Sequence, residues 1–260
     1  MMPGASWRRR IAIALALCAG LLTHAVAAQA DANALWNIVH GHCVPDEIQH
    51  GDPKPCAEVD LRDGVAGGFA ILKDVRGATQ FLLIPTRQVS GIESPSLLAP
   101  HAANYFADAW RARHFVDSAL GHALPRDDLS LAINSEQARS QNQLHIHIDC
   151  IRGDVRDALE HARFAIGRRW MPLPVLLRGH RYRAIRVIGN SLDGQNPVKL
   201  LAWGVPGARA DMGHHTLLVV GMWFPHHVPG FIILDDRADQ AHGDYAGAEE
   251  LQDHDCALGR

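Results

Sequence analysis

The alternation of apolar and chemically active side chains from Leu144 to Ile151 constrains the fold of this chain more than any other stretch. Read with a strand's period of two, it puts His145, His147 and Asp149 on one face and apolar side chains on the other. Two imidazoles and a carboxylate spaced in this way can converge on one small group in a cleft. A solvated strand face is the alternative, but three adjacent groups able to bind or transfer protons are more than such a face needs. We therefore interpret the stretch as part of an active site.

The first thirty residues are typical of an export signal rather than of a folded domain. Three arginines at 8–10 precede the apolar run 11–22, and residues 28–30 (Ala-Gln-Ala) match a small-residue cleavage site. An uncleaved membrane anchor is the alternative, because an apolar stretch of roughly 18 to 20 residues can span a bilayer. Both interpretations place the remainder outside the cytoplasm, because the arginines hold the amino terminus inside. We expect it at the periplasmic face of the inner membrane.

Cysteine usage agrees with export. Apart from Cys18 in the signal, an even set of cysteines remains, which predicts disulfides in an oxidising compartment. Among the possible connectivities we favour Cys43 with Cys56, closing a proline-rich loop, and Cys150 with Cys256, tying the chain's end to the histidine strand. A zinc site is the weaker alternative, because no pair has the close CxxC spacing of structural zinc sites.

The charge balance excludes one class of partner. Without the signal arginines the chain carries 22 basic and 28 acidic residues, a net charge of about −6 with neutral histidines. This predicts no nucleic-acid partner. Arginines gather downstream of the histidine strand and are candidates to face diphosphate or a membrane surface, with a solvated basic face as an equal alternative. They are Arg152, Arg168, Arg169, Arg178 and Arg181.

The secondary-structure signals predict an α+β fold. Helices are expected at 31–41, 104–120 and 158–170, with a proline-rich loop at 43–63. Strands are expected at 68–73 and 80–84, joined as a hairpin, and then at 129–134, 144–151, 182–188, 216–223 and 230–234. The order strand, strand, long helix, strand, strand indicates an antiparallel sheet with a helix on one face.

Several motifs, taken in order, resemble a known family. Gln80-Phe-Leu-Leu-Ile-Pro-Thr-Arg, Leu131-Ala-Ile-Asn and Gln141-Asn-Gln-Leu-His-Ile-His-Ile-Asp are similar to the histidine triad (HIT) superfamily of nucleotide hydrolases and transferases. The export signal, Trp170-Met-Pro-Leu-Pro and Leu251-Gln-Asp-His-Asp-Cys extend this to a closer resemblance, with the CDP-diacylglycerol pyrophosphatase family. The resemblance implies a HIT-like catalytic core at 31–152, behind the signal or anchor at 1–30, and an α+β extension at 153–260 packed on that core.

The same resemblance implies hydrolysis of CDP-diacylglycerol to CMP and phosphatidate. His147 would attack the α-phosphorus and give a covalent nucleotidyl-histidine that water opens, with no cofactor and no metal. His145 would orient His147 or bind phosphate. Asn134, Gln141 and Asn142 would hold the phosphate oxygens.

Asp149 departs from the superfamily pattern, which usually has a third histidine at this position. A carboxylate 4 Å from a phosphate charge is repelled by roughly 4 kcal/mol at an effective dielectric of 20, so it should not touch the phosphate while ionised. We expect Asp149 to orient His145 or His147 through a ring N–H. A protonated carboxyl that serves as an acid is the alternative.

Weaker candidates lie elsewhere. Asp74, in the hairpin turn, is a candidate ribose contact, although an acidic residue is common in any turn. The histidine pairs at 214–215 and 226–227 invite a metal interpretation, but adjacent residues point opposite ways on a strand, so scattered loop histidines are favoured. Two other functions remain open: a hydrolase of soluble nucleotide diphosphates, and a catalytically silent nucleotide- or lipid-binding protein.

Overall fold

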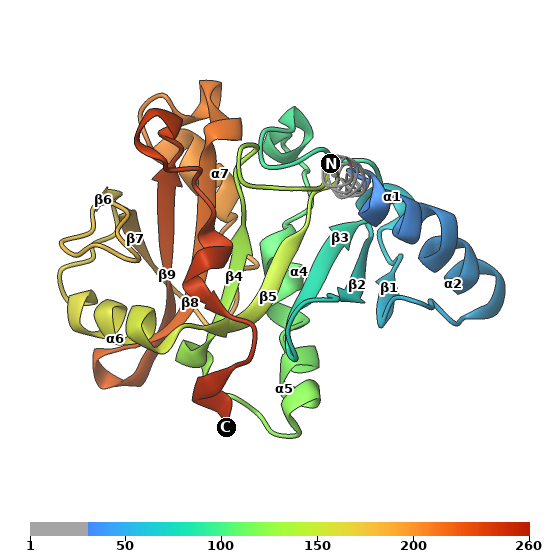
Figure 1. The fold of residues 1–260 in the computed structure, drawn as a ribbon, viewed down its shortest axis with the longest axis horizontal. Helices are drawn as coiled ribbons and strands as arrows, with labels where there is room; N and C mark the ends of the chain where they lie inside the picture. The colour runs from blue at the N-terminus through green and yellow to red at the C-terminus, as the bar shows by residue number, and fades with distance from the viewer. Residues whose placement is uncertain (1–30) are drawn as a thin grey trace, which may run out of the picture. The chain divides into compact units, whose positions relative to one another are not determined.

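Ten strands form one antiparallel sheet within residues 31–260, the part of the chain that the computed structural model describes (Figure 1). The predicted signal or anchor at 1–30 lies outside the described residues. The strand order is β1-β2-β3-β5-β4-β8-β9-β7-β6, and β10 pairs with β5. The strands are β1 (Glu58–Asp60), β2 (Phe69–Lys73), β3 (Phe81–Pro85), β4 (Leu129–Ile133), β5 (Ile146–Ile151), β6 (Met171–Pro172), β7 (Arg183–Ile188), β8 (His215–Phe224), β9 (Val228–Arg237) and β10 (Gln252–Asp253).

The α+β class, the antiparallel sheet and the hairpin of β2 and β3 are confirmed. The strands expected around residues 130, 185, 220 and 232 are also present, as β4, β7, β8 and β9. The helices differ more from expectation. They are α1 (Ala34–Ile38), α2 (Val44–His50), α3 (Gly64–Gly67), α4 (Tyr105–Arg111), α5 (His114–Leu120), α6 (Gly153–Ala162) and α7 (Pro197–Gly204).

The helix expected at 104–120 is wrong in one respect, because it is two helices, α4 and α5. Side chains at the break bond to carbonyl oxygens that a continuous helix would use. The Arg113 guanidinium donates to the Trp110 carbonyl at 2.6 Å, and His114 Nδ1 lies 3.1 Å from the Arg111 carbonyl. The chain therefore turns between the two helices while keeping its apolar residues on the sheet.

Two other helix boundaries were also wrong. The first helix does not end near Gly41, because a π-helical turn, Val39–Cys43, joins α1 to α2. Helical structure therefore continues to His50, into the first part of the loop expected at 43–63. The helix expected at 158–170 begins at Gly153 and ends at Ala162. The chain leaves it to follow the sheet, where the Gly167 carbonyl accepts a hydrogen bond from Arg186 N at 2.7 Å.

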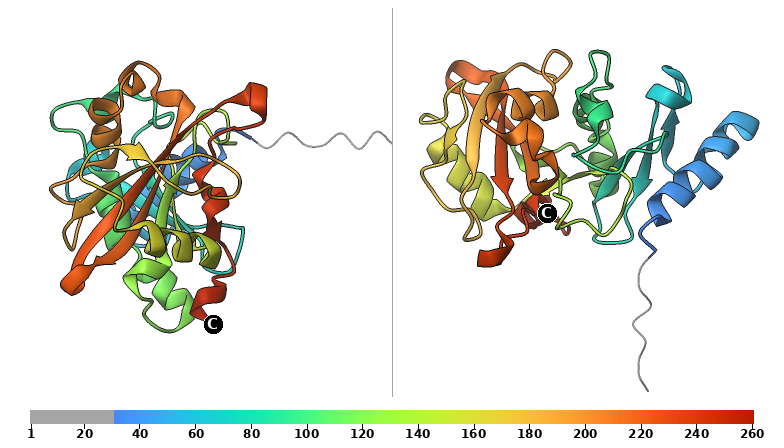
Figure 2. Two further views of the ribbon diagram at one scale, coloured as in Figure 1. Left: turned by 90° about the vertical axis from the view of Figure 1, so that its left-hand side faces the viewer. Right: turned by 90° about the horizontal axis from the view of Figure 1, so that it is seen from above.

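The two faces of the sheet are covered differently. On one face α4, α5 and α7 pack on a large apolar core that includes Ile146, Ile148 and Cys150 of β5. The opposite face carries two separate apolar clusters, one beneath α6 and one beneath α1 and α2. Figure 1 shows α6 and the C-terminal segment, residues 248–260, in front of the strands, and the left panel of Figure 2 shows this segment and α7 on opposite sides. The histidine side of β5 lies between the two clusters.

Both favoured disulfides are confirmed. Cys43 is joined to Cys56, between α2 and β1, and Cys150 of β5 is joined to Cys256 near the chain's end. The second bond fastens the C-terminal segment to the central strand. Gln252 adds to this, because its amide donates to the carbonyls of Ser130 and His147 at 3.2 and 3.3 Å.

The sheet runs without interruption past residue 152, since β4 pairs with both β5 and β8. The division into a core at 31–152 and an extension at 153–260 stays a prediction. Within residues 31–260, no helix combines the length and the apolar character that crossing a membrane requires.

Candidate active site

Strand β5 holds the histidine side chains in a buried strip between the apolar clusters. Its neighbours are β3 and β4, with Leu82 and Ala132 opposite His147. His145, His147 and Asp149 are 8%, 4% and 0% exposed, so the face they share is not a solvated one. The solvated-face alternative is therefore wrong.

The His147 ring has one satisfied nitrogen and one free nitrogen. Gln80 Nε2 donates to His147 Nδ1 at 2.8 Å, whereas Nε2 is buried and has no hydrogen-bond partner among the described residues. Glu249 Oε2 lies 3.6 Å from Nε2, beyond hydrogen-bond distance. Burial, followed by the neighbouring His145, lowers the pKa of His147 well below the ordinary value, so the ring is neutral at neutral pH.

The Gln80 amide determines which nitrogen of His147 carries the proton. With the amide as oriented, Nδ1 accepts and the proton resides on Nε2; Gln80 Oε1 then has no hydrogen-bond partner in the described part of the chain. Turning the amide over would bring this oxygen to Nδ1–H and leave a lone pair on Nε2. The orientation seen here is favoured by Glu249, whose Oε1 lies 3.3 Å from the same amide nitrogen.

Glu249, which the sequence analysis missed, places a carboxylate among four donor groups. Asn134 Nδ2 donates to it at 3.0 Å, and Asn134 Oδ1 accepts from the Glu249 backbone N–H at 3.1 Å. Burial acts to raise the pKa of Glu249, but the His147 ring and the Gln80 and Asn134 amides lower it below the ordinary value. The carboxylate is therefore ionised, and the groups around it form an anion-binding cradle.

The expected partner of Asp149 was wrong. Its carboxylate accepts from neither His145 nor His147, but from His254 Nδ1 at 2.8 Å, from the Thr79 hydroxyl at 2.7 Å and from Cys150 N at 2.9 Å. The Asp149 hydrogen bond raises the pKa of His254 above its ordinary value. Burial pushes the pKa of Asp149 upward as well, but the hydrogen bonds it accepts favour the carboxylate, so we describe the pair as imidazolium and carboxylate.

His254, also missed, reaches the same carboxylate as His147. Its Nε2 lies 3.5 Å from Glu249 Oε1, so the Glu249 carboxyl group lies between the Nε2 atoms of two imidazoles, one neutral and one charged. The sequence held a signal for this residue. A disulfide between Cys150 and Cys256 requires the chain two residues before Cys256 to pass close to Asp149.

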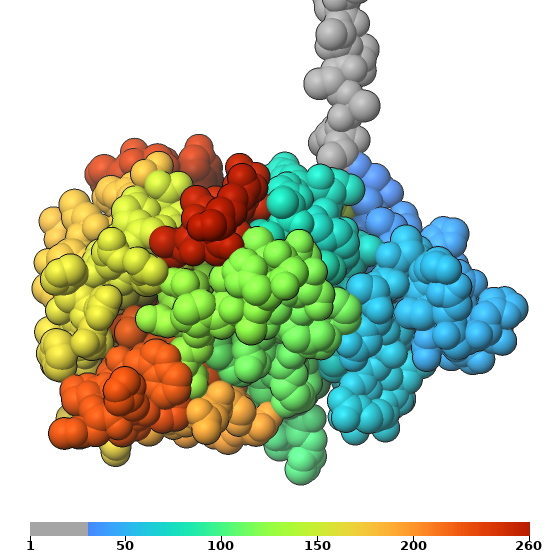
Figure 3. Space-filling view, turned by 90° about the horizontal axis from the view of Figure 1, so that it is seen from below, coloured from blue at the N-terminus to red at the C-terminus, as the bar shows by residue number. Residues whose placement is uncertain are grey.

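The hairpin turn at 74–79 packs directly on His254. The Ala78 N–H donates to the His254 carbonyl at 2.9 Å, and a Cβ at Gly77 would lie 2.4 Å from the His254 Cβ. Gly77 also has a φ of +62°. Both the close approach of His254 and this backbone conformation therefore favour glycine. Figure 3 shows the dark red C-terminal segment between this teal hairpin and the yellow-green start of α6.

A pocket of about 340 Å³ opens beside these groups. Asn134, Glu249 and His254 line one side of it, and Arg76 contributes a positive charge. His147 is not part of the lining, because the Glu249 carboxylate lies between its ring and the pocket. Access to the free His147 nitrogen therefore requires Glu249 to move.

The other expected residues lie in different places. His145 is beside His147, with ring centroids 4.9 Å apart, and its Nδ1 lies 2.8 Å from the Gln143 carbonyl. Gln141 instead holds the start of α1, since its amide donates to the Asp31 carbonyl and accepts from Leu35 N. Asn142 is exposed next to it.

Asp74 and Arg152 do not line the pocket either, and each interacts with a residue close to it in sequence. Asp74 accepts from Arg76 N at 3.0 Å within its own turn, which is the ordinary role of an acidic turn residue. Arg152 pairs with Asp154 at 3.0 Å. Arg168 and Arg169 lie at a separate pocket of about 920 Å³, beside Trp170 and Ile185, which belong to the core on the opposite side of the sheet.

Comparison with known proteins identifies the family of this chain. Residues 30–260 match the family described as CDP-diacylglycerol pyrophosphatase. A protein of Yersinia pestis named CDP-diacylglycerol pyrophosphatase is 42% identical over 255 residues, which cover 97% of this chain and 95% of that relative. The match extends over the histidine strand, Asn134 and the C-terminal segment alike. This chain belongs to the CDP-diacylglycerol pyrophosphatase family.

Proposed function

We propose that this protein hydrolyses CDP-diacylglycerol to CMP and phosphatidate through a covalent nucleotidyl intermediate on His147. Family membership supports the substrate. The observation that carries the mechanism is the buried His147 Nε2, a neutral ring nitrogen with no hydrogen-bond partner within residues 31–260, directed at an anion-binding cradle. A neutral imidazole is an adequate nucleophile at neutral pH.

In the first step the α-phosphate takes the place of the Glu249 carboxylate. Once Glu249 has left, the Gln80 amide turns over, and the ring proton of His147 exchanges through solvent from Nε2 to Nδ1, where Gln80 Oε1 accepts it. His147 Nε2 then holds the lone pair. Asn134 Nδ2 faces a phosphate oxygen, where it stabilises the charge that develops in the transition state. The lone pair of His147 Nε2 attacks the phosphorus, an N–P bond forms, and the bond from phosphorus to the bridging oxygen breaks. The electron pair leaves with phosphatidate, which receives the proton of the His254 imidazolium.

In the second step water attacks the same phosphorus. His254, now neutral, accepts a proton from this water, the N–P bond breaks, and CMP leaves while His147 regains its lone pair. Asp149 orients His254 and stabilises its charged form through the 2.8 Å hydrogen bond. This sequence uses only side chains, and we expect turnover to continue in the presence of a chelator.

The test is covalent trapping. Rapid mixing with radiolabelled substrate followed by acid-free denaturation should leave about one CMP per wild-type chain and none on His147→Ala. His114→Ala, an exposed histidine outside the site, is the matched control and should label like the wild type. Absence of an adduct and of turnover in the wild type would favour a binding protein. Loss of turnover on chelation, in protein that circular dichroism shows to remain folded, would overturn the metal-free mechanism.

Substrate class is tested by comparing CDP-diacylglycerol in mixed micelles with a soluble CDP ester. The proposal expects the lipid substrate to give the higher kcat/KM, as suits an enzyme that works at the periplasmic surface of the inner membrane. Equal values for the two substrates would favour a hydrolase of soluble nucleotide diphosphates.

A further inference from the structure

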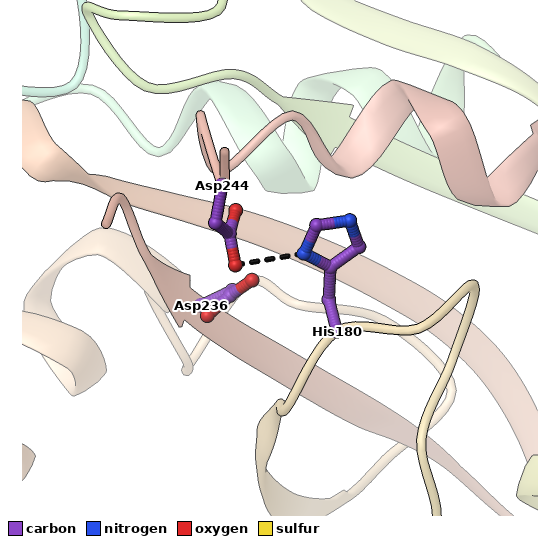
Figure 4. A group of neighbouring side chains, drawn as sticks. All are labelled: His180, Asp236 and Asp244. Atoms are coloured by element: carbon purple, nitrogen blue, oxygen red, sulfur yellow. Dashed lines mark hydrogen bonds and ion pairs between the residues drawn. The ribbon is translucent and has the colours of Figure 1, made fainter. Parts of the chain in front are cut away.

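Three side chains of metal-ligand type converge beside the pocket of about 340 Å³, on residues that do not contact His147. His180, Asp236 and Asp244 each offer one ligand atom, and these atoms lie within 4.8 Å of one another (Figure 4). They come from three segments: the tight turn before β7, the end of β9 and the loop that follows the 3₁₀ turn Gln240–His242. The proposed mechanism uses none of them.

Within this cluster, one of the two carboxylate oxygens of Asp236 has a hydrogen-bond donor within residues 31–260 and the other does not. The residue is 7% exposed, and its Oδ1 accepts from Arg237 N at 2.7 Å. Its Oδ2 is buried with no hydrogen-bond partner among the described residues. Figure 4 shows the Asp236 carboxyl group turned toward Asp244 rather than away from it. A buried carboxylate oxygen that faces a second carboxylate needs a proton or a cation.

The third residue of the cluster, His180, is already positioned by the Asp244 carboxylate. His180 Nδ1 lies 2.7 Å from Asp244 Oδ2, and Asp244 Oδ1 accepts from Ala246 N at 2.9 Å. One imidazole nitrogen and two carboxylate oxygens, with room for water, form a ligand set of the kind that zinc and manganese accept. Calcium and magnesium prefer oxygen ligands alone.

We propose that His180, Asp236 and Asp244 bind a divalent transition-metal cation. On binding, the His180 Nδ1 proton goes to solvent, and the nitrogen and the two carboxylates turn to the metal. His180 and Asp244 line the 340 Å³ pocket, so the ion can enter from solvent. The ion connects the end of β9 to the loop that leads to Glu249, and its effect is to stabilise the fold rather than to take part in the reaction.

The experiment titrates Mn²⁺ alone into the metal-free full-length protein and follows the electron paramagnetic resonance signal of the free ion. We expect one saturable site per chain and a higher unfolding temperature in its presence. Asp236→Asn keeps the shape of the side chain but removes its charge, and it should weaken Mn²⁺ binding at least tenfold. His180→Gln should do the same. His242→Ala, an exposed histidine on the same loop, is the control and should bind like the wild type.

Two results would overturn the proposal. One is the absence of saturable binding to the wild type, which would make the cluster a carboxyl pair that shares a proton. The other is binding to Asp236→Asn and His180→Gln with wild-type affinity. If Asp236→Asn does not fold, His180→Gln decides alone, because His180 lies in a partly exposed turn. These measurements use no substrate, so they are independent of the proposed hydrolysis.

Discussion

At the level of single residues, two imidazoles in different charge states lie on either side of one carboxylate. Burial lowers the pKa of His147, and the Asp149 hydrogen bond raises the pKa of His254. A nucleophile and a proton donor with these properties can act at the same pH without competing for one proton. His147 and His254 are the same residue type, so the difference between their pKa values comes from their surroundings.

The pH dependence of activity follows from these two shifts. The pKa of His254 is raised above 6.5, so the acid needed in the first step is lost as pH rises through that raised value. The pKa of His147 is lowered, so the nucleophile is lost only in acid. We expect kcat/KM to fall on the alkaline side, and Asp149→Asn to move this fall to lower pH. Measuring kcat/KM as a function of pH for the wild type and for Asp149→Asn tests this. An Asp149→Asn profile that matches the wild type would contradict the role of Asp149.

The same pair affects stability. Because the folded-state pKa of His254 lies above its unfolded value, the ion pair stabilises the fold fully below about pH 6.5, and this stabilisation is lost as pH rises through the folded pKa. Urea unfolding of the wild type should therefore show a decline across neutral pH. His254→Gln should lack this decline.

At the level of elements, the 3₁₀ turn Ala248–Leu251 carries Glu249 into the position that the α-phosphate occupies in the proposed mechanism. An ionised carboxylate beside a diphosphate is repelled by roughly 4 kcal/mol at 4 Å and an effective dielectric of 20, so displacement opposes substrate binding. Glu249 also holds the Gln80 amide in the orientation that keeps a proton on His147 Nε2. The turn therefore acts as a displaceable cover over the nucleophile.

Removing the Glu249 charge tests this role. Glu249→Gln should lower KM, and the dissociation constant of CMP, about tenfold, which corresponds to about 1.4 kcal/mol of relieved repulsion. Glu160→Gln is the control, because that side chain is exposed on α6, pairs with Arg163 and does not line the pocket. An unchanged KM with a kcat at least a hundredfold lower would show that Glu249 acts as a catalytic base.

The hairpin turn positions His254 by direct contact. In Gly77→Ala the added Cβ clashes with the His254 backbone, and alanine has to adopt a positive φ. We therefore expect a loss of about 3 kcal/mol in unfolding free energy together with a fall in kcat. Gly64→Ala separates the two causes, because Gly64 has a φ of +68° but no atom within 4 Å of the added Cβ. It should cost about 1 kcal/mol and leave kcat unchanged. Equal effects on kcat in both variants would rule out the contact with His254.

At the level of the whole molecule, the two disulfides have separate consequences. The Cys150–Cys256 bond closes 106 residues and contributes about 5 kcal/mol by the loop-closure argument, against about 3 kcal/mol for the 13 residues of Cys43–Cys56. Only the first holds His254 and Glu249 over β5. Replacing Cys150 and Cys256 by serine should lower both stability and kcat, whereas the same change at Cys43 and Cys56 should lower stability alone. Steady-state kinetics and urea unfolding of the two variants check this, and a fall in kcat shared by both would contradict it.

The features that could be predicted from the sequence are those that a short stretch of residues determines. Period-two alternation was enough for the strand of His145 and His147, and apolar runs were enough for the hairpin. An even cysteine set behind a predicted export signal was enough to expect disulfides. The break between α4 and α5 was missed because side chains of Arg113 and His114 replace the helical hydrogen bonds there, and helical periodicity continues through the break.

The sequence by itself therefore determined the histidine strand, the hairpin before it and the nucleophile candidate. Only the tertiary structure decided what surrounds that nucleophile, because Glu249 and His254 lie about a hundred residues further along the chain and reach β5 through a disulfide and strand pairing. It also gave Asp149 its partner. A carboxylate in a strand shows which face it occupies, but which proton it accepts depends on a contact between distant segments, and no local periodicity encodes that contact.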